Sequence, residues 1–322
     1  MKNIVILVPE EAVMQAIADP QYLFNTANQM LLSTGREALF SITLAGAHTE
    51  VPVSNGSYRV RTDALIDEID EADLVIVPAL FGDMERAVRK NERLIDWLRA
   101  RYHGGSEIAS LCVGAFLLAQ TGLLDGKKCS THWGFYNEFR ERYPAVEVVD
   151  GSIITEEGRL YSSGGAHSYW NLLLYILEKY TDRNIAILAS KYFAIDIDRD
   201  NQSAFAMFKG QKNHKDADVL KAQDYIEENS HEKLTIDDLA DHVNLGRRSF
   251  ERRFKQATGN SVLEYIHRVK IESAKRSFES SRKNINEVMF DVGYTDTKAF
   301  RTVFKKITGL TPMEYRNKYN RN

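Results

Sequence analysis

The chain of 322 residues has only two cysteines, Cys112 and Cys129, which cannot form the framework of several disulfides typical of small secreted domains. Its eight histidines and two cysteines show no metal-ligand spacing, so we expect no metal and no cofactor. It lacks both a run of 18 apolar residues and a basic leader followed by an apolar core. These absences predict a reduced, cytoplasmic protein with no membrane partner.

Negative charge is scarce at one end of the chain. Residues 245–322 contain 18 Lys and Arg against 8 Asp and Glu, a net charge of +10. The preceding 244 residues contain 24 against 37, a net charge of −13, so the overall value of −3 hides a strong partition. A basic end on an acidic body indicates where a polyanion would bind, and such binding should weaken steeply with salt.

A segment in this basic end occurs twice, from Phe250 to Tyr265 and again fifty positions later, from Phe300 to Tyr315. A repeat of this period indicates one supersecondary unit used twice. Each copy reads as a short helix, a tight turn at Asn244 or Gly293, and a second helix. Asn and Gly are the residues that best tolerate the positive φ of such a turn. The pattern predicts two helix-turn-helix units.

The second helix of each copy should have an apolar stripe and a polar face. Phe250 and Phe254 share the stripe that packs inward, while Arg248 and Arg252 point away from it. The second copy repeats this arrangement, with Phe300 and Phe304 inward and Lys298 and Thr302 outward. A charged face is often merely solvated, but the repeat, the turn and the opposed Phe pairs together favour DNA binding in a major groove.

The segment between the copies, from Val262 to Ser280, has helical periodicity and contains neither Gly nor Pro. A helix of this length would span about 28 Å. It could therefore hold the two units roughly one duplex turn apart, about 34 Å, so that one chain enters two successive major grooves.

From about Val219 to Arg316 the chain resembles the AraC/XylS transcription regulators, including the second-repeat signature that runs from Val288 to Tyr315. Two residues depart from the family pattern: Met289 replaces a small residue, and Gly246 replaces a capping Ser. The resemblance implies base contacts at eight positions, and to these we add the Lys that recurs after the second Phe of each copy. The resulting DNA-binding set is Arg248, Ser249, Glu251, Arg252, Lys255, Thr297, Lys298, Arg301, Thr302 and Lys305.

The N-terminal part alternates apolar runs with helical patterns. Runs at 4–8, 41–45, 74–77 and 108–111 read as buried parallel strands, and helices are expected at 85–102 and 115–120, with a last one at 182–195. This alternation predicts a doubly wound, flavodoxin-like α/β sheet, which binds ligands at the carboxyl ends of its strands.

Cys112 lies at such a strand end. The sequence Leu111-Cys112-Val113-Gly114 leads from strand to helix through a sharp turn, as in a nucleophile elbow. A thiol at a helix N-terminus is expected to ionise more easily. The alternative is a structural thiol that is simply packed in the core.

Residues 2–205 resemble the ThiJ/PfpI superfamily, a class I glutamine amidotransferase-like fold, and specifically its GlxA-like branch, which is fused to AraC-type domains. The stretches that carry the resemblance are 109–116, 122–127, 131–133 and 162–165. Gln202 and Phe205 also stand where that branch has a Gln and a Phe. Peptidase-type members place a His directly after the elbow Cys, whereas this chain has Val113, so ligand binding is favoured over catalysis and no catalytic residue is assigned. The expected ligand-binding residues are Glu10, Cys112, Val113, His132 and His167.

The sequence as a whole therefore predicts an α/β plus all-α protein. Residues 1–195 form the effector-sensing and dimerisation domain, 196–216 a linker, and 217–322 the DNA-binding domain. The function expected is a homodimeric transcription regulator that binds double-stranded DNA under control of a small-molecule effector. Two alternatives stay open: a cysteine-dependent α/β enzyme (hydratase or hydrolase-like) that carries a DNA-binding module, and a constitutive DNA binder with a vestigial α/β domain. The sequence names neither effector nor operator.

Overall fold

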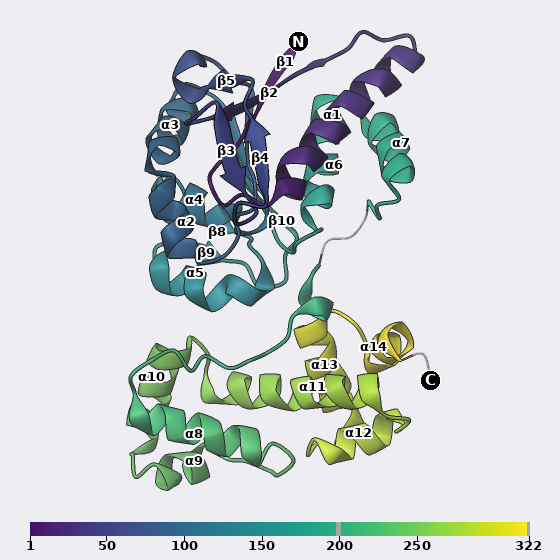
Figure 1. Ribbon diagram of the computed structural model, residues 1–322. Helices are drawn as coiled ribbons and strands as arrows, with labels where there is room; N and C mark the ends of the chain where they lie inside the picture. The colour runs from purple at the N-terminus through teal and green to yellow at the C-terminus, as the bar shows by residue number, and fades with distance from the viewer. Residues whose placement is uncertain (198–200, 321–322) are drawn as a thin grey trace. The chain divides into compact units, whose positions relative to one another are not determined.

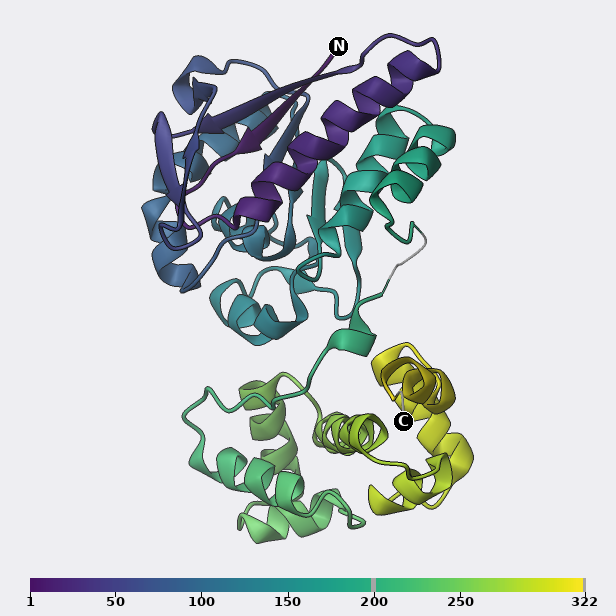
Figure 2. The same cartoon turned by 45° about the vertical axis from the view of Figure 1, so that its right-hand side comes forward.

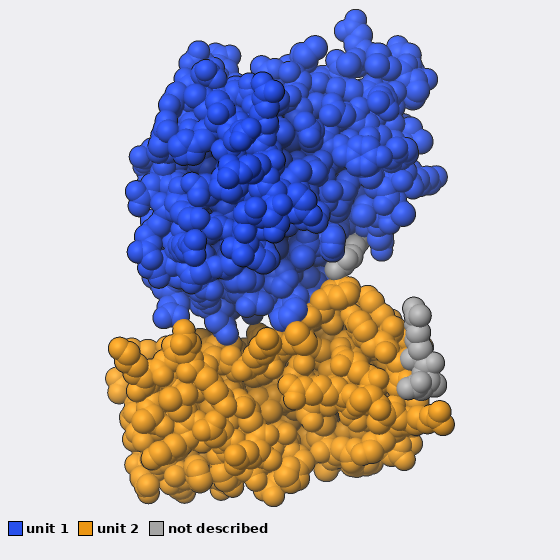
Figure 3. All heavy atoms as spheres, in the orientation of Figure 1, with its two compact units in different colours: residues 1–202 blue, residues 203–322 orange. Residues whose placement is uncertain are grey.

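The computed structural model describes residues 1–197 and 201–320. The chain forms two compact units, Met1–Gln202 and Ser203–Asn322 (Figure 3). The division falls inside the predicted linker, of which residues 198–200 lie outside the described residues. The first unit has one buried apolar core and the second unit has two.

The first unit is built on a seven-stranded sheet with the order β10-β11-β7-β6-β1-β2-β5 (Figure 1). All neighbouring strands pair in parallel except β10 and β11, which are antiparallel. The central strands β1, β6 and β7 are nearly all buried, because helices cover both faces of the sheet. The strands are β1 (Lys2–Leu7), β2 (Phe40–Gly46), β5 (Ala64–Leu65), β6 (Leu74–Val77), β7 (Glu107–Ser110), β10 (Ile154–Glu157) and β11 (Leu160–Ser163). The predicted doubly wound α/β fold is confirmed.

Figures 1 and 2 show the helices of this unit on the two sides of the sheet. One group contains α1 (Met14–Ser33), α6 (Tyr169–Tyr180) and α7 (Arg183–Phe193), and the other contains α2 (Met84–Lys90), α3 (Glu92–His103) and α4 (Ala115–Gln120). Smaller pieces complete the unit: the pairs β3–β4 (Glu50–Val53, Tyr58–Arg61) and β8–β9 (Lys128–Cys129, Glu147–Val148), helix α5 (Tyr136–Arg142), and the 3-10 turns η1 (Ile66–Glu68), η2 (Cys112–Gly114) and η3 (Trp133–Phe135).

The single helix predicted over 85–102 is wrong, because the structure divides it into α2 and α3 at Asn91. The Asn91 side chain accepts a hydrogen bond from the Glu10 N–H and donates to the Glu10 and Ala87 carbonyls. The helix is interrupted at Asn91 because its buried side-chain amide forms hydrogen bonds with backbone groups, including those of Glu10 on another segment.

The second unit has two apolar cores along one long helix, α11 (Val262–Ser280), as Figure 1 shows. On one side lie α8 (Ala217–Glu228), α9 (Ile236–His242) and α10 (Arg247–Thr258); on the other lie α12 (Ile285–Asp291), α13 (Thr297–Thr308) and α14 (Pro312–Tyr319). The side chains of Ser261, Asn284 and Thr311 each close a capping box at a helix start.

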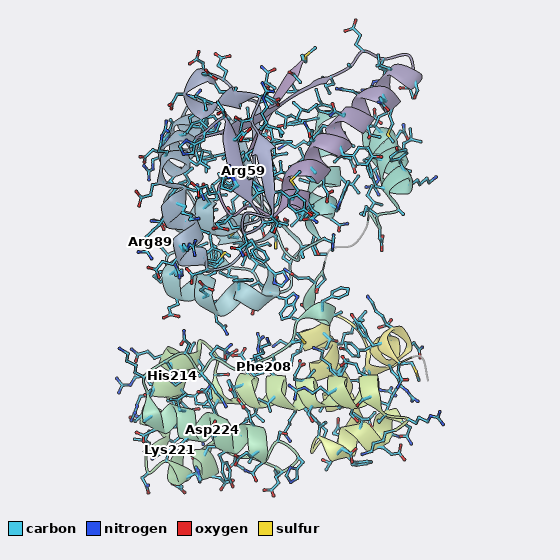
Figure 4. All side chains as sticks on the ribbon, viewed as in Figure 1. Arg59, Arg89, Phe208, His214, Lys221 and Asp224 are labelled. Atoms are coloured by element: carbon cyan, nitrogen blue, oxygen red, sulfur yellow. The ribbon has the colours of Figure 1, made fainter. Side chains whose placement is uncertain are left out.

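The described part of the predicted linker is irregular apart from the short turn η4 (Ser203–Phe205), and it is anchored by hydrogen bonds. Gln202 is buried in the first unit. In the second unit the Phe208 N–H donates to Glu272 of α11, and Lys275 of α11 donates to the Ala206 carbonyl. Phe208 (labelled in Figure 4) packs edge-on against Tyr265, with ring centroids 5.1 Å apart. The segment therefore follows α11 closely.

Candidate functional site

The two helix-turn-helix units have the same local geometry. The turn residue Asn244 has φ 54° and its counterpart Gly293 has φ 73°. In each turn the residue that follows donates its N–H to the helix before it, Leu245 to Ala240 and Tyr294 to Met289. Each second helix ends at a glycine with positive φ, Gly259 or Gly309.

The four phenylalanines of α10 and α13 are fully buried, as the sequence predicts. They are Phe250, Phe254, Phe300 and Phe304. The ring centroids within each pair lie 5.5 and 5.7 Å apart, respectively. These rings fix which side of each helix faces solvent, because a rotation of the helix would expose them at a cost of about 1.5–3 kcal/mol for each ring.

The opposite faces carry the predicted cations. Arg248, Arg252 and Lys255 on α10 are exposed, as are Lys298, Arg301, Thr302 and Lys305 on α13, whereas Ser249, Glu251 and Thr297 are half-buried. Within residues 201–320, none of these six cations has a carboxylate within ion-pair distance. Unneutralised cations on a helix face are available to phosphates and base edges.

Other charged residues of α10 form ion pairs within the protein. Arg253 donates to both Asp216 and Asp218 at the start of α8, at 2.6–3.0 Å. Arg247 pairs with Asp237 at 3.0 Å and lies 3.7 Å from Glu251. Arg247 is exposed and begins α10 as Thr297 begins α13, so the fifty-residue repeat could have added it to the predicted set.

The helix starts differ between the two units. Asp296 caps α13 by accepting the Ala299 N–H at 2.6 Å, whereas Gly246 at the start of α10 has no side chain to do so. Gly246 departs from the family pattern, which has a capping Ser here, and α10 is therefore the less firmly capped recognition helix.

In the first unit Cys112 occupies a strained elbow. It follows β7 and begins η2. Its φ is 55°, a backbone angle that residues other than glycine rarely adopt. Gly114 allows the elbow to pack closely, since a Cβ there would lie 2.5 Å from the Pro78 carbonyl oxygen. The Cys112 N–H donates to Ser163 Oγ, and Thr131 Oγ1 donates to the Cys112 carbonyl.

The Cys112 thiol is sealed from solvent. The residue is only 5% exposed, and burial raises the pKa of the thiol to about 12, although the Val113 N–H partly opposes this shift. The expectation of an easily ionised thiol is wrong, because desolvation of the thiolate outweighs the effect of the backbone amide. Cys129 is also free and buried, with its pKa raised to about 12 for the same reason.

The other predicted ligand residues differ in burial and in their hydrogen-bond and ion-pair partners. Val113 is adjacent and buried. His132 is half-buried, accepts the Gly134 N–H and has its pKa lowered by burial. His167 is exposed. Glu10 pairs with Lys90 of α2 at 3.4 Å, so its carboxylate is directed to a neighbouring helix.

Sequence reasoning missed a constellation beside the elbow. Asp19 on α1 accepts hydrogen bonds from Tyr169 Oη at 2.6 Å and from Trp170 Nε1 at 2.9 Å. Burial, Asp19 and the neighbouring Cys112 raise the pKa of Tyr169. Because Asp19 precedes Tyr169 by 150 residues and Trp170 by 151, no spacing in the sequence could have joined them.

Gln202, the last residue of the first unit, forms hydrogen bonds with segments next to the elbow. Its Oε1 accepts the Gly165 N–H at 2.8 Å, and its Nε2 donates to the Thr131 carbonyl at 3.0 Å. Gly164 leaves room for the Gln202 amide, since a Cβ at this position would lie 1.9 Å from Gln202 Nε2 and would displace that side chain. Thr131 therefore contacts Cys112 on one side and Gln202 on the other.

Across the described ranges, 1–197 and 201–320, no cluster of three or more His, Cys, Asp or Glu is arranged to hold a metal ion. A helix both long and apolar enough to span a membrane is likewise missing from that part of the chain.

Two family models match the chain. Residues 239–318 match a helix-turn-helix domain model, and residues 21–179 match that of the DJ-1/PfpI family.

The chain is similar to two transcriptional regulators of Pseudomonas aeruginosa. It is 27% identical to the HTH-type transcriptional regulator ArgR over 77% of this chain and 71% of that protein. It is 26% identical to the HTH-type transcriptional regulator GbdR over 90% of this chain and 77% of that protein.

Among solved structures, an AraC family transcriptional regulator from Pseudomonas putida has a TM-score of 0.52 and 20% identity, and covers 60% of this chain and all of that one. Drosophila melanogaster DJ-1beta has a TM-score of 0.50 and 20% identity, over 61% of this chain and 98% of that one. At these identities the likeness shows the fold alone.

Proposed function

We propose that this chain, an AraC-type transcription regulator with a DJ-1/PfpI domain ahead of its helix-turn-helix domain, changes its DNA binding when a small molecule occupies the Cys112 elbow. One observation carries the DNA-binding half of this proposal. Two recognition helices, built alike, each present cations that have no carboxylate within ion-pair distance in the described chain. Two such helices, one on each side of α11, suit consecutive major grooves.

The DNA contacts that we propose are the exposed and half-buried polar residues of α10 and α13. Arginines at positions 248, 252 and 301 suit bidentate contacts to guanine, and lysines at 255, 298 and 305 suit phosphates. Ser249, Thr297 and Thr302 can bond either bases or phosphates, and Glu251 can accept from cytosine.

The first prediction separates a DNA-reading arginine from its structural neighbour. Arg252→Ala should weaken binding to a selected duplex by about 1–3 kcal/mol and relax the preference at one base pair. Arg253→Ala is the matched control, because Arg253 bonds Asp216 and Asp218. It should lower thermal stability and leave base preference unchanged. Fluorescence anisotropy on duplexes that differ at single base pairs measures both; an unaltered preference in Arg252→Ala would remove Arg252 from the DNA-binding set.

The elbow is proposed as a sensing site rather than a catalytic one. A Cys nucleophile must be ionised and needs a base about 3 Å away. The raised pKa and the 5% exposure of Cys112 oppose the first requirement, and Val113 replaces the adjacent His of peptidase-type members. The exposed His167 and the half-buried His132 and Asp19 offer polar groups to a ligand, and the Asp19 carboxylate beside Tyr169 and Trp170 favours one with a positive charge.

The second prediction concerns Cys112→Ser. If the elbow senses a ligand, a metabolite that changes DNA affinity in the wild type should still do so in this variant, because a hydroxyl preserves most of the packing. A panel of small positively charged and neutral metabolites, screened by thermal shift and then by DNA binding, provides the test. Turnover of a metabolite that Cys112→Ser abolishes would instead establish the enzyme. A panel without any effect would favour the vestigial domain.

A route from the elbow to the second unit runs through Gln202. Thr131 bonds both Cys112 and Gln202, and Gln202 is the last residue of the first unit. A ligand that displaces Thr131 or the Gly164–Gly165 turn would therefore disturb the anchor of the segment that leads to α11. Such a ligand shifts the regulator only if it binds the two arrangements with different affinity.

The third prediction tests this route. Gln202→Ala removes hydrogen bonds to Gly165 and Thr131, so effector and DNA binding should each persist while the effect of one on the other falls severalfold or more. Gln211→Ala, in the same segment but within the second unit, is the control. An unchanged coupling in Gln202→Ala, measured by titrating DNA with and without effector, would rule Gln202 out of the route.

We further propose a cytoplasmic homodimer formed through the first unit, as the family resemblance implies. Tyr22 of α1 and Tyr192 of α7 support this, since both are more than half exposed and their hydroxyls lie 3.0 Å apart on adjacent helices. Sedimentation of the full chain measures the oligomeric state directly.

A further inference from the structure

The two helix-turn-helix units meet along α11, and the part of this helix around Lys270 is called the waist below. The apolar core of the first helix-turn-helix unit reaches Ile266 and Val269, and the core of the second helix-turn-helix unit begins at Ile271. Lys270 lies between the two cores and is 5% exposed. In Figure 2, α11 is seen nearly end-on between the two groups of helices.

The Lys270 ammonium bridges the two halves. Its Nζ donates to the Glu232 carbonyl at 2.9 Å, in the loop between α8 and α9. It also donates to the Val292 carbonyl at 3.0 Å and lies 3.4 Å from that of Gly293, in the turn between α12 and α13. Within the described chain no carboxylate pairs with it. All three N–H donors of the ammonium are thus directed at backbone groups drawn from both halves.

The two halves also approach each other closely at this point. A Cβ at Gly293 would lie 2.4 Å from the His231 carbonyl oxygen and 2.5 Å from Lys270 Nζ. The turn of the second helix-turn-helix therefore packs directly against the α8–α9 loop of the first. The Tyr294 ring, with its centroid 5.6 Å from Lys270 Nζ, covers the ammonium.

Stability alone does not account for a lysine at this position. Burial penalises its charge and lowers its pKa, and replacing a buried charge by an apolar side chain of similar volume is often neutral or stabilising. What an apolar residue could not supply is directional hydrogen bonding to both halves at once. Buried polar groups that add no net stability can still select one arrangement among several.

We propose that Lys270 is a positioning residue that fixes the spacing and rotation of the two recognition helices, and so the distance between the two DNA half-sites that one chain can occupy together. Simultaneous engagement of two linked modules gains about 10²–10⁴ in affinity and is lost when their geometry does not match. A change in the waist therefore alters spacing preference before it alters either half-site contact. This inference rests on DNA binding by both units and is independent of the effector site.

The experiment compares Lys270→Met with the full-length wild type. A duplex is first selected from random sequence with the wild type, and base pairs are then inserted or removed one at a time between its two half-sites. The wild type should prefer one spacing and lose at least tenfold in affinity two base pairs away from it. In Lys270→Met this preference should flatten to within about threefold, while affinity for a duplex with only one half-site stays within about twofold. Lys221→Met, an exposed lysine on α8, should behave as the wild type.

Several results would overturn the proposal. One is a Lys270→Met protein that is folded by circular dichroism and keeps the wild-type spacing preference; another is a wild type without any such preference. Lys270→Arg, which keeps a cationic donor, should retain more of the preference than Lys270→Met. If Lys270→Met does not fold, Gly293→Ala takes its place: it should shift or flatten the preference by forcing His231 and the turn apart, and an unchanged preference would refute the role of the waist. Failure of the wild type to bind any duplex would count against DNA binding itself.

Discussion

Raising the salt concentration from 50 to 200 mM should weaken binding of a selected duplex by about a thousandfold. The six exposed cations of the predicted DNA-binding set, none of which has a carboxylate within ion-pair distance in the described chain, are expected to displace about six counterions, and a slope near −0.9 for each gives this loss. The net charge of +10 on residues 245–322 acts in the same direction. Fluorescence anisotropy at constant pH across this salt range measures the slope.

Two matched lysines show whether the slope comes from the recognition helices. Lys298 has no carboxylate partner within the described chain, and Lys298→Ala should reduce the slope by about one. Lys283 is paired with Asp291 at 2.8 Å, so Lys283→Ala should leave the slope nearly unchanged. A slope close to zero in the wild type would contradict the proposed DNA-binding surface.

Phe304→Ala should destabilise the second helix-turn-helix by about 3–5 kcal/mol, the usual cost of removing a buried aromatic ring. Phe304 is fully buried, and its ring centroid lies 5.5–5.7 Å from those of Phe278, Phe300 and Tyr315. The three rings would face a cavity, and α13 would lose the contact that holds its cations outward. Hydrogen exchange of the α13 amides in the full chain reports this free energy locally.

Phe290 on α12 is the control, because it is 59% exposed. Phe290→Ala should change the same exchange free energy by less than about 0.5 kcal/mol. Protection of the α13 amides that survives Phe304→Ala would mean that the Phe pair does not hold the recognition helix. Binding to the half-site read by α13 should fall together with this protection.

The helix-turn-helix units were predictable because their determinants are local. The period of the Phe pairs, the turn residues Asn244 and Gly293, and the capping side chains all act within a few residues of the elements that they define. The repeat then doubled each signal. The single helix expected over 85–102 failed for the opposite reason, since Asn91 breaks it by bonding the distant Glu10.

The sequence predicted the position of Cys112 but not the pKa of its thiol. Its place at the end of a strand followed from the sequence pattern, but the ionisation of Cys112 depends on how much protein covers the thiol. Desolvation is set by every element packed around a group, and no spacing encodes it.

The sequence by itself therefore determined the two architectures, their order, the outward cations and the position of the elbow cysteine, because periodicity, turn chemistry and charge are properties of neighbouring residues. Only the tertiary structure decided which charges are already paired, that Asp19 joins Tyr169 and Trp170, that Gln202 is anchored beside Thr131, and that Lys270 bridges the two halves of the DNA-binding unit. Each of these contacts joins residues far apart in the chain, and its strength depends on burial, which exists only once the chain has folded.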